Sequence, residues 1–240
     1  MPVPLFPTPA TVRVPPNTHG RDIAVGDIHG AFSALQDALR AVTFDTRCDR
    51  LFALGDLVDR GPESPRVMDW LAQPWFHAIC GNHDYMIWRA ALGQPFDYID
   101  HRLYGGEWLE TLPEPEQQRI GARLAQLPVV IEVETPHGVV GLVHADCPFD
   151  DWQEMHRIDW RGLDGMSSFA AQCLWSVDRF RFRYTGLVRN IHAVVHGHTT
   201  ISGVARLGNC HFIDTGGWRA GGHFTLLDLH RLQPLNSGIR

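Results

Sequence analysis

Three times in its first half, the chain passes from a short apolar segment through a polar loop into an amphipathic stretch. The apolar segments are DIAVG (22–26), RLFALG (50–55) and WFHAICG (75–81), and each has the length and composition of a buried β-strand. Strands that alternate with helices favour a parallel sheet, since a parallel connection needs a crossover that a helix can supply. The sequence therefore predicts an α/β fold.

The stretches after these strands have helical periodicity. Their apolar side chains recur every three or four residues, which places them on one face of a helix. The positions expected to face the sheet are Phe32, Leu35, Leu39 and Val42 in the first helix and Val67, Trp70 and Leu71 in the second. A third helix is expected to begin at Met86, after a loop formed by NHDY (82–85).

The second half of the chain predicts further strands in a different arrangement. VVIEVE (129–134) and VVGLVHA (139–145) are expected to form a hairpin, followed by a helix at 167–177 and a strand at HAVVHG (192–197). Three later segments have an alternation that suits antiparallel strands, at 203–208, 210–215 and 223–229.

The remaining segments define the expected domain organisation. Residues 93–128 are rich in Gly, Pro, Trp and charge, and are interpreted as a mainly helical insertion with one helix at 115–127. With neither a solenoid repeat nor a convincing linker, one domain over residues 21–232 is predicted. The proline-rich segment 1–20 is expected to be a stiffened leader, with partial disorder left open.

Composition limits the classes of partner and the compartment. The net charge of −6 argues against a protein whose main task is binding nucleic acid or an anionic membrane by bulk electrostatics. The five cysteines are scattered without CxxC spacing, so a reducing compartment fits best. The sequence shows neither a secretory signal nor an apolar run of membrane-spanning length, and a cytoplasmic protein is predicted.

Five polar loops follow apolar strands, and they carry the functional signal. They are GDIHG (26–30), GDLVDRGP (55–62), GNHD (81–84), HAD (144–146) and HGHT (196–199). Ligand sites in open α/β sheets lie beyond the carboxyl ends of strands, so these loops are expected to converge. One Gly-Asp at a strand end is usually a turn, but five loops loaded with Asp, Asn and His are hard to explain as turn chemistry.

The residue types in these loops are metal ligands. Carboxylate and amide oxygens combined with imidazoles, without thiolates, suit Mn²⁺, Fe or Zn²⁺. The number of candidate ligands suits two ions, and paired ions about 3.5–4 Å apart clamp the attacking and leaving oxygens of a displacement at phosphorus. The sequence therefore predicts phosphoester hydrolysis by metal-activated water.

These five motifs, in this order, resemble the phosphoprotein phosphatases of the serine/threonine PPP family, within the metallophosphoesterase superfamily. The resemblance spans about residues 22–229, and HADCPFDDW (144–152), GHTTISGV (197–204) and FIDTGGW (212–218) are typical of its bacterial and bacteriophage branch. It implies a β-sandwich of two mixed sheets flanked by helices. It also implies two divalent metal ions, with Mn²⁺ expected ahead of Fe or Zn²⁺.

The resemblance assigns roles to individual residues. The implied metal ligands are Asp27, His29, Asp56, Asn82, His144 and His198. Asp27 and His29 would bind the first ion, Asp56 would bridge both, and the other three would complete the second. Helix capping is the alternative for Asn82. His196 competes with His198; strand alternation would place both on one face, with His196 supporting the ligands.

His83 resembles the general acid of the family, paired with Asp59, and Arg60 would bind two phosphate oxygens. The alternatives are a turn aspartate and a surface arginine. In this branch a second phosphate-binding arginine follows a tryptophan by two residues, but that spacing from Trp175 leads here to Val177.

Arg179 is the nearest substitute for that arginine, in the segment DRFRFRY (178–184). The alternation of arginine and aromatic residues there could equally be the two faces of an extended segment. The insertion, with Tyr98, Tyr104 and Trp108, is expected from its position to wall one side of the cleft.

The motifs are compatible with three functions. The first is a phosphoprotein phosphatase acting on phosphoserine and phosphothreonine, and more broadly on phosphotyrosine and other phosphomonoesters. The second is a symmetrical dinucleoside tetraphosphatase, in whose known relatives alanine commonly occupies the position of Asp59. The third is a silent module that binds phosphorylated partners. The presence of Asp59 favours the phosphatase, with phosphorylated proteins or small phosphoesters as substrates.

Overall fold

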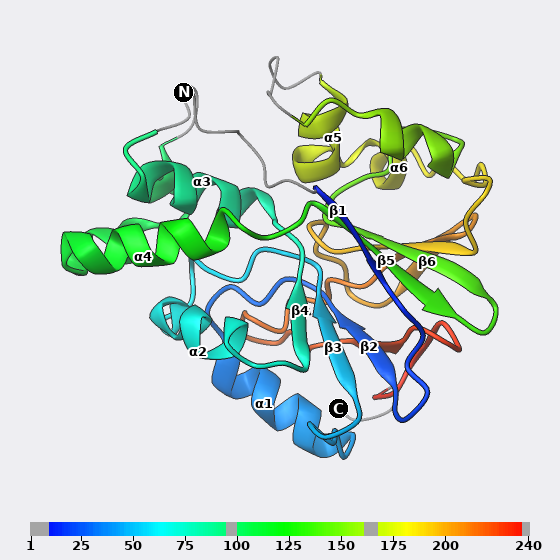
Figure 1. Ribbon diagram of the computed structural model, residues 1–240, viewed down its shortest axis with the longest axis horizontal. Helices are drawn as coiled ribbons and strands as arrows, with labels where there is room; N and C mark the ends of the chain where they lie inside the picture. The colour runs from blue at the N-terminus through cyan, green and yellow to red at the C-terminus, as the bar shows by residue number, and fades with distance from the viewer. Residues whose placement is uncertain (1–9, 95–99, 161–167, 237–240) are drawn as a thin grey trace.

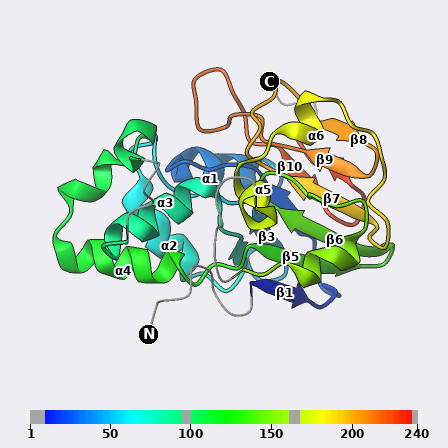
Figure 2. The same cartoon turned by 90° about the horizontal axis from the view of Figure 1, so that it is seen from above.

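Two mixed β-sheets pack face to face in the computed structural model, with helices on both outer sides (Figure 1). The structure describes residues 10–94, 100–160 and 168–236. One sheet has the strand order β1-β5-β6-β7-β9-β8, and the other has the order β11-β10-β2-β3-β4. Figure 2 shows α2, α3 and α4 gathered on one side of the strands and α6 on the opposite side, near β8 and β9. The predicted fold of two mixed sheets flanked by helices is confirmed.

The five-stranded sheet contains the three predicted strand–loop–helix units. Strands β2 (Asp22–Val25), β3 (Arg50–Ala53) and β4 (Phe76–Ala78) are parallel, as predicted. Strand β10 (Leu226–Asp228) pairs antiparallel with β2, and β11 (Gln233–Pro234) pairs with β10. The carboxyl ends of β2, β3 and β4 therefore meet at one edge.

The helices that follow these strands bury the predicted faces. Helix α1 (Phe32–Ala41) buries Phe32, Leu35 and Leu39, and α2 (Val67–Leu71) follows a short helix, η1 (Ser64–Arg66). The buried side chains of α2 are Val67, Trp70 and Leu71. Apolar periodicity was thus sufficient to predict which sides of both helices face the sheet.

The third helix starts earlier than predicted. Helix α3 (Asn82–Ala91) begins at Asn82, so NHDY is its first turn and not a loop. The Asp84 carboxylate accepts hydrogen bonds from the backbone N–H groups of Gly81 (2.9 Å) and Leu57 (2.9 Å). Asp84 thus closes the start of α3 onto the loop after β3, and it holds His83 in the first turn.

The six-stranded sheet combines parallel and antiparallel pairs. Strands β5 (Val130–Thr135) and β6 (Gly138–Val143) form the predicted hairpin. Strand β7 (Ala193–His196) is parallel to both β6 and β9 (Cys210–Phe212), and β9 is antiparallel to β8 (Ala205–Leu207). The expectation of antiparallel strands is therefore right for β8 and β10 and wrong for the pairing of β9 with β7.

Strand alternation divides the core into layers. In the five-stranded sheet, Ala24 and Phe52 point to the core between the sheets, while Ile23, Val25 and Leu51 belong to the core that also contains the helices. The core between the sheets also includes side chains from the other sheet, among them Ile131, Val133, Val140, Leu142 and Val195. Burial on both faces explains why these strands read as continuous apolar runs.

The leader contains a strand that the sequence did not indicate. Strand β1 (Thr11–Val14) pairs parallel with β5, with Thr11 opposite Val130. The prolines around this segment argue against a strand, and its partner strand lies far along the chain. No local pattern therefore indicated β1. Within the leader, residues 11–14 form this strand, and residues 1–9 lie outside the described residues.

The described part of residues 93–128 forms three helical segments, namely η2 (His101–Tyr104), η3 (Glu107–Thr111) and α4 (Glu114–Leu124). Helix α4 packs closely on α3 at Gly121, where an added Cβ would lie only 2.6 Å from the Cβ of Ala91. No helix within the described residues is long and apolar enough to cross a membrane.

Three more helical segments cover the six-stranded sheet, namely η4 (Trp152–Arg157), α5 (Phe169–Trp175) and α6 (Asp178–Arg181). Helix α5 was predicted. Helix α6 corrects the extended segment considered for 178–184: Arg179 is buried while Arg181 and Phe182 are exposed. In a strand, residues 179 and 181 would lie on one face, so their different burial is that of a helical turn; the alternation of residue types in the sequence does not reveal this over so few residues.

Candidate functional site

The polar loops converge at the carboxyl edges of both sheets. Asp27 and His29 follow β2, Asp56 follows β3, His144 follows β6, and His198 follows β7. The predicted residues that the structure brings together are Asp27, His29, Asp56, Asp59, Arg60, Asn82, His83, His144 and His198. All lie in loops or in the first turn of α3.

Asp56 is the centre of this cluster. Its Oδ2 lies 3.6 Å from Nε2 of His29, and its Oδ1 lies 3.4 Å from Nε2 of His144. Asp56 is also the residue common to two groups of potential metal ligands, one with His29 and His83 and one with His144 and His198. Because each carboxylate oxygen faces a different group, one side chain can serve two ions.

Asn82 belongs to the second group. Its Oδ1 lies 2.9 Å from Nε2 of His144 and 3.1 Å from Nδ1 of His198. The amide oxygen faces the imidazole nitrogens instead of capping α3, whose N-cap residue is Gly81. This placement matches the ligand interpretation of Asn82 and not the alternative of helix capping.

Backbone carbonyls fix the orientation of three histidines. Nδ1 of His29 lies 2.9 Å from the oxygen of Val58, and Nδ1 of His144 lies 2.6 Å from that of Leu54. Nε2 of His198 lies 3.2 Å from the oxygen of Trp175. A carbonyl only accepts, so each of these nitrogens carries its proton and leaves the other with a lone pair toward the cluster. This is the orientation that metal-binding histidines adopt.

Burial favours the neutral form of His29 and His198. It lowers the pKa of His29 to about 3 and that of His198 to about 4. Neutral imidazole is the form that binds metal ions. For His29 and His198, both the tautomer and the neutral form are therefore those of a metal ligand.

The carboxylates of the site repel each other. Burial raises the pKa of Asp27 well above its usual range, and the nearby charges of Asp214 and Asp56 raise it further. Burial would also raise the pKa of Asp56, but the surrounding imidazoles, of which His144 contributes most, hold it below its usual range. Cations bound here would relieve this repulsion, so the donor set fits divalent metal ions.

His83 has a different partner from the other histidines. Its Nδ1 donates to Oδ2 of Asp59 over 2.7 Å, and both side chains are almost fully buried. The second oxygen of Asp59 accepts from Nε1 of Trp108, also at 2.7 Å. Burial raises the pKa of Asp59, and the hydrogen bonds from His83 and Trp108 oppose that shift. A carboxylate, unlike a carbonyl, can stabilise a protonated imidazole by charge.

Arg60 lies across both imidazoles of the first group. Its guanidinium lies 2.7 Å from Nε2 of His29 and 2.9 Å from Nε2 of His83. The same guanidinium lies 4.8 Å from the ring centroid of Trp218, whose indole also packs edge-on against His29. Arg60 therefore has no carboxylate partner among these contacts, and it keeps its charge at the site.

Several site residues adopt left-handed backbone conformations. The φ angles are 44° for His29, 48° for Asp56, 73° for Asp59, 64° for Arg60 and 59° for His198. Glycine is the residue that usually occupies this region, because a Cβ atom is crowded there. These turns aim the side chains back toward the centre of the cluster.

Two residues lie elsewhere than predicted. Arg179 is buried beside Asp146, with Nε 3.4 Å from Oδ1 of that carboxylate, and it donates to the oxygen of Gly186. Its guanidinium also covers the ring of Tyr184. These contacts hold Arg179 in a structural ion pair, and it is not part of the cluster around Asp56.

His196 makes contacts other than those of the predicted ligands. It stacks on Phe212 and its Nδ1 lies 3.2 Å from the oxygen of Val143. Strand β7 ends at His196, and the left-handed turn at His198 breaks the alternation, so the two histidines do not share a face. The expectation that they do is wrong.

Comparison with known protein families identifies the family of this chain. Residues 23–202 match the family of calcineurin-like phosphoesterases, and this match covers most of the chain. The chain belongs to the calcineurin-like phosphoesterase family. All five polar loops lie within the matched residues.

This calcineurin-like phosphoesterase is similar to bacterial enzymes over nearly its whole length. It is 32% identical over 213 residues to serine/threonine-protein phosphatase 2 of Escherichia coli (strain K12), covering 85% of this chain and 91% of that protein. It is 34% identical over 206 residues to serine/threonine-protein phosphatase 1 of Salmonella typhimurium, covering 84% and 88%. These matches confirm the resemblance to bacterial phosphoprotein phosphatases.

Solved structures support the fold. A protein serine/threonine phosphatase from Saccharomyces cerevisiae aligns with a TM-score of 0.61 at 17% identity, over 93% of this chain and 78% of that one. A cold-active protein-tyrosine phosphatase of a Shewanella species aligns with a TM-score of 0.59 at 16% identity, over 94% and 79%. At these identities the likeness concerns the fold alone.

Four residues of the site had no role assigned from the sequence, or only a general one. They are Asp84, Trp108, Asp214 and Trp218. Asp214 had a usable signal, because it ends an apolar strand as Asp27 and Asp56 do. Trp108 was expected only to wall the cleft, together with Tyr98 and Tyr104. The ring of Tyr104 lies 6.2 Å from the ring of His83, between centroids, and Tyr98 lies outside the described residues.

Proposed function

We propose that this phosphoesterase is a metal-dependent phosphoprotein phosphatase that hydrolyses phosphoserine and phosphothreonine, and more broadly phosphotyrosine and other phosphomonoesters. The observation that carries the proposal is the buried His83–Asp59 pair beside the two ligand groups that share Asp56. The names of the similar bacterial proteins support it.

Two divalent ions would be held by residues of this chain. Asp27, His29 and Asp56 would bind the first, and Asp56 would share the second with the remaining ligands, which are Asn82, His144 and His198. When bound, the ions would supply an activated water and offset charge on the phosphate. The nitrogen and oxygen donors support Mn²⁺, with Fe or Zn²⁺ as alternatives.

His83 also lies near His29 and Asp56, so its role needs an argument of its own. We assign it as the general acid because its partner is the Asp59 carboxylate. That negative charge favours the imidazolium, which can donate its Nε2 proton to the departing alkoxide. The histidines held by carbonyls lack this support, and they are assigned as ligands.

Arg60 is assigned to the substrate phosphate. Its guanidinium donates to the Nε2 lone pairs of both His29 and His83 in this structure, and one lone pair cannot serve two partners. Arg60 would therefore be free of both rings when His29 holds a metal ion and His83 carries a proton on Nε2. The freed guanidinium can then form two parallel hydrogen bonds to phosphate oxygens.

The test is turnover of para-nitrophenyl phosphate and of a phosphothreonine peptide with added Mn²⁺. Asp56→Asn and His83→Asn should each abolish turnover of the peptide. The matched controls, Asp37→Asn and His137→Asn, change exposed residues and should keep it. Metal-loaded protein that is inactive on every monoester would exclude the proposal.

A second candidate is a symmetrical dinucleoside tetraphosphatase. The chain is 32% identical over 143 residues to the enzyme of that name from Coxiella burnetii, covering 58% of this chain and 45% of that protein. Asp59, bound to His83, favours the phosphatase. Initial rates on diadenosine tetraphosphate and on a phosphopeptide would separate the two.

We also place the enzyme in a reducing compartment, the cytoplasm. All five cysteines are free, and four of them are buried in the core. Core thiols without disulfide partners are typical of proteins that fold under reducing conditions. A fusion to a fluorescent protein, followed in living cells, would test this placement.

A further inference from the structure

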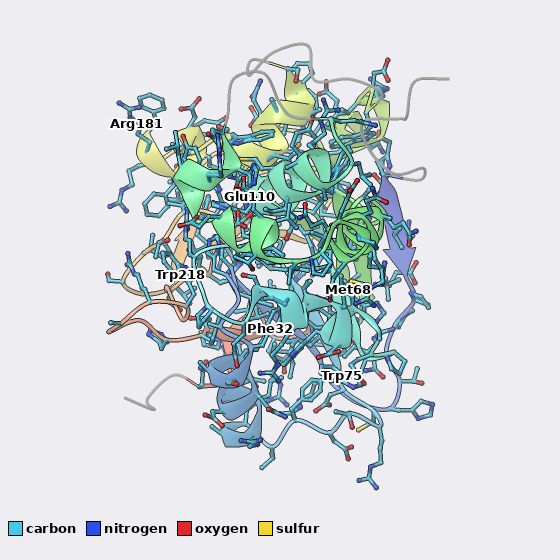
Figure 3. The ribbon with its side chains drawn as sticks, turned by 90° about the vertical axis from the view of Figure 1, so that its left-hand side faces the viewer. Phe32, Met68, Trp75, Glu110, Arg181 and Trp218 are labelled. Atoms are coloured by element: carbon cyan, nitrogen blue, oxygen red, sulfur yellow. The ribbon has the colours of Figure 1, made fainter. Side chains whose placement is uncertain are left out.

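The loop Gly216–Gly222 joins β9 to β10, and it has a closed base. Thr215 Oγ1 donates to the oxygen of His223 at 2.5 Å, and Gly216 and His223 form a β-bridge. A Cβ at Gly222 would collide with the carbonyl oxygen of Gly216, so only glycine fits there. The base therefore presents the tip, Trp218 and Arg219, in a defined position (Figure 3 labels Trp218).

The tip reaches the candidate active site through Trp218. The indole ring lies 4.8 Å from the guanidinium carbon of Arg60, and its centroid lies 4.9 Å from that of His29. Its Nε1–H is buried and has no hydrogen-bond partner within the described residues. A buried donor without an acceptor is costly, and a ligand that supplies an acceptor would satisfy it.

Arg219 adds a positive charge beside this indole. Its guanidinium carbon lies 5.9 Å from the Trp218 ring, and its side chain lies over Gly216, with Nε 2.6 Å from where a Cβ there would be. Arg219 is exposed and forms no ion pair with any described residue. The nearby carboxylate of Asp214 is already bonded to Thr200 and to the N–H of Gly216.

Two guanidinium groups thus contact one indole at the site. Arg60 is assigned to the scissile phosphate, and Arg219 lies against the same indole without an anion of its own. An unpaired cation next to an anion site raises affinity for substrates that carry a second negative charge. In a peptide substrate, that charge would come from a side chain close to the phosphorylated residue.

We propose that Arg219, with the indole N–H of Trp218, forms a second anion subsite that selects phosphopeptides with an acidic residue next to the phosphorylated one. This inference rests on the proposed phosphatase function. Arg219 acts on binding, so the selection is expected in KM more than in kcat. An exposed charge pair at the edge of a site changes affinity by up to about fivefold.

The test uses two phosphothreonine peptides that differ only by Glu or Gln in the two positions flanking the phosphothreonine. The Mn²⁺-loaded wild type should show a kcat/KM about two- to fivefold higher for the Glu peptide, and the difference should shrink as salt is raised. Arg219→Gln should bring the ratio to about 1. Arg206→Gln, which changes an exposed arginine on the edge strand β8, should keep the wild-type ratio.

The outcomes separate this inference from the function on which it rests. Equal rates on both peptides in the wild type, or an unchanged preference in Arg219→Gln, would overturn the subsite and leave the phosphatase in place. Turnover of diadenosine tetraphosphate without turnover of either peptide would overturn both. Trp218→Phe keeps an aromatic ring, although a smaller one, and removes the N–H; it should reduce the preference for Glu while the melting temperature stays near that of the wild type.

Discussion

Replacement of Asp59 by Asn tests the assigned proton donor most directly. The carboxylate accepts from His83 at 2.7 Å and from Trp108 at 2.7 Å, both away from solvent. An Asn has one oxygen for these two donors and no charge to stabilise the imidazolium. A buried hydrogen bond to a charged group contributes about 1.5–3 kcal/mol, so the loss corresponds to about a 10- to 150-fold slower step.

The choice of substrate makes this prediction specific. Alkoxide leaving groups of phosphoserine and phosphothreonine need a proton, whereas para-nitrophenolate is a stable anion that needs little protonation. Asp59→Asn should therefore slow a phosphothreonine peptide about 100-fold and para-nitrophenyl phosphate less than about tenfold. Steady-state kcat on both substrates, with saturating Mn²⁺, measures the difference.

A double-mutant cycle supplies the refutation. If Asp59 acts through His83, the Asp59→Asn/His83→Asn variant should be no slower than His83→Asn alone. Trp108→Phe, which removes the other donor to Asp59, should leave the ratio of the two substrates near that of the wild type. Equal slowing of both substrates by Asp59→Asn, or additive losses in the double variant, would refute the assignment.

Three further predictions concern metal binding and stability. Asp56→Asn should reduce bound Mn²⁺ from two ions per chain to fewer than one in metal analysis, because each of its oxygens faces a different ligand group. Asp146→Asn should lower the free energy of unfolding in urea by about 2 kcal/mol, since it removes one of the two carboxylates that face the buried guanidinium of Arg179 and leaves only Asp150, at 3.7 Å; a loss below about 1 kcal/mol would contradict this. Burial, aided by the charge of Arg206, lowers the pKa of His211 to about 4, whereas an unfolded chain has a histidine pKa of about 6.5. The contribution of neutral His211 to the free energy of unfolding is therefore complete above pH 6.5 and is lost as the pH falls toward 4. When the pH falls from 7 to 5, the free energy of unfolding of the wild type should decrease by about 2 kcal/mol more than that of His211→Gln. Equal decreases in the two proteins would contradict the burial argument.

Local patterns were sufficient for the elements that carry the ligands. The strands before Asp27, Asp56 and Asn82 are short apolar runs, and the residues after them belong at the carboxyl edge of a parallel sheet for topological reasons. That argument brought loops together from across the chain without any knowledge of their contacts. It could not give the tautomers of the histidines, because these depend on backbone carbonyls such as that of Trp175.

The errors came from interactions that a local pattern does not contain. Strand β1 depends on pairing with β5, more than a hundred residues away. The early start of α3 depends on Asp84, which binds a loop in another unit. Arg179 looked available for phosphate because its partner, Asp146, lies in a different segment. In each case a distant partner decided the outcome.

The left-handed backbone of the site has a consequence for the evolution of this protein. Five residues of the candidate site hold a conformation that costs a non-glycine residue about 1–2 kcal/mol, although aspartate tolerates it better. Their total approaches the whole net stability of about 5–15 kcal/mol that a domain of this kind possesses. We expect glycine at these positions to make the fold more robust and, under the proposed roles, to abolish activity. Selection for durability and selection for turnover therefore oppose each other at the same few residues, and stabilising changes must come from elsewhere in the chain.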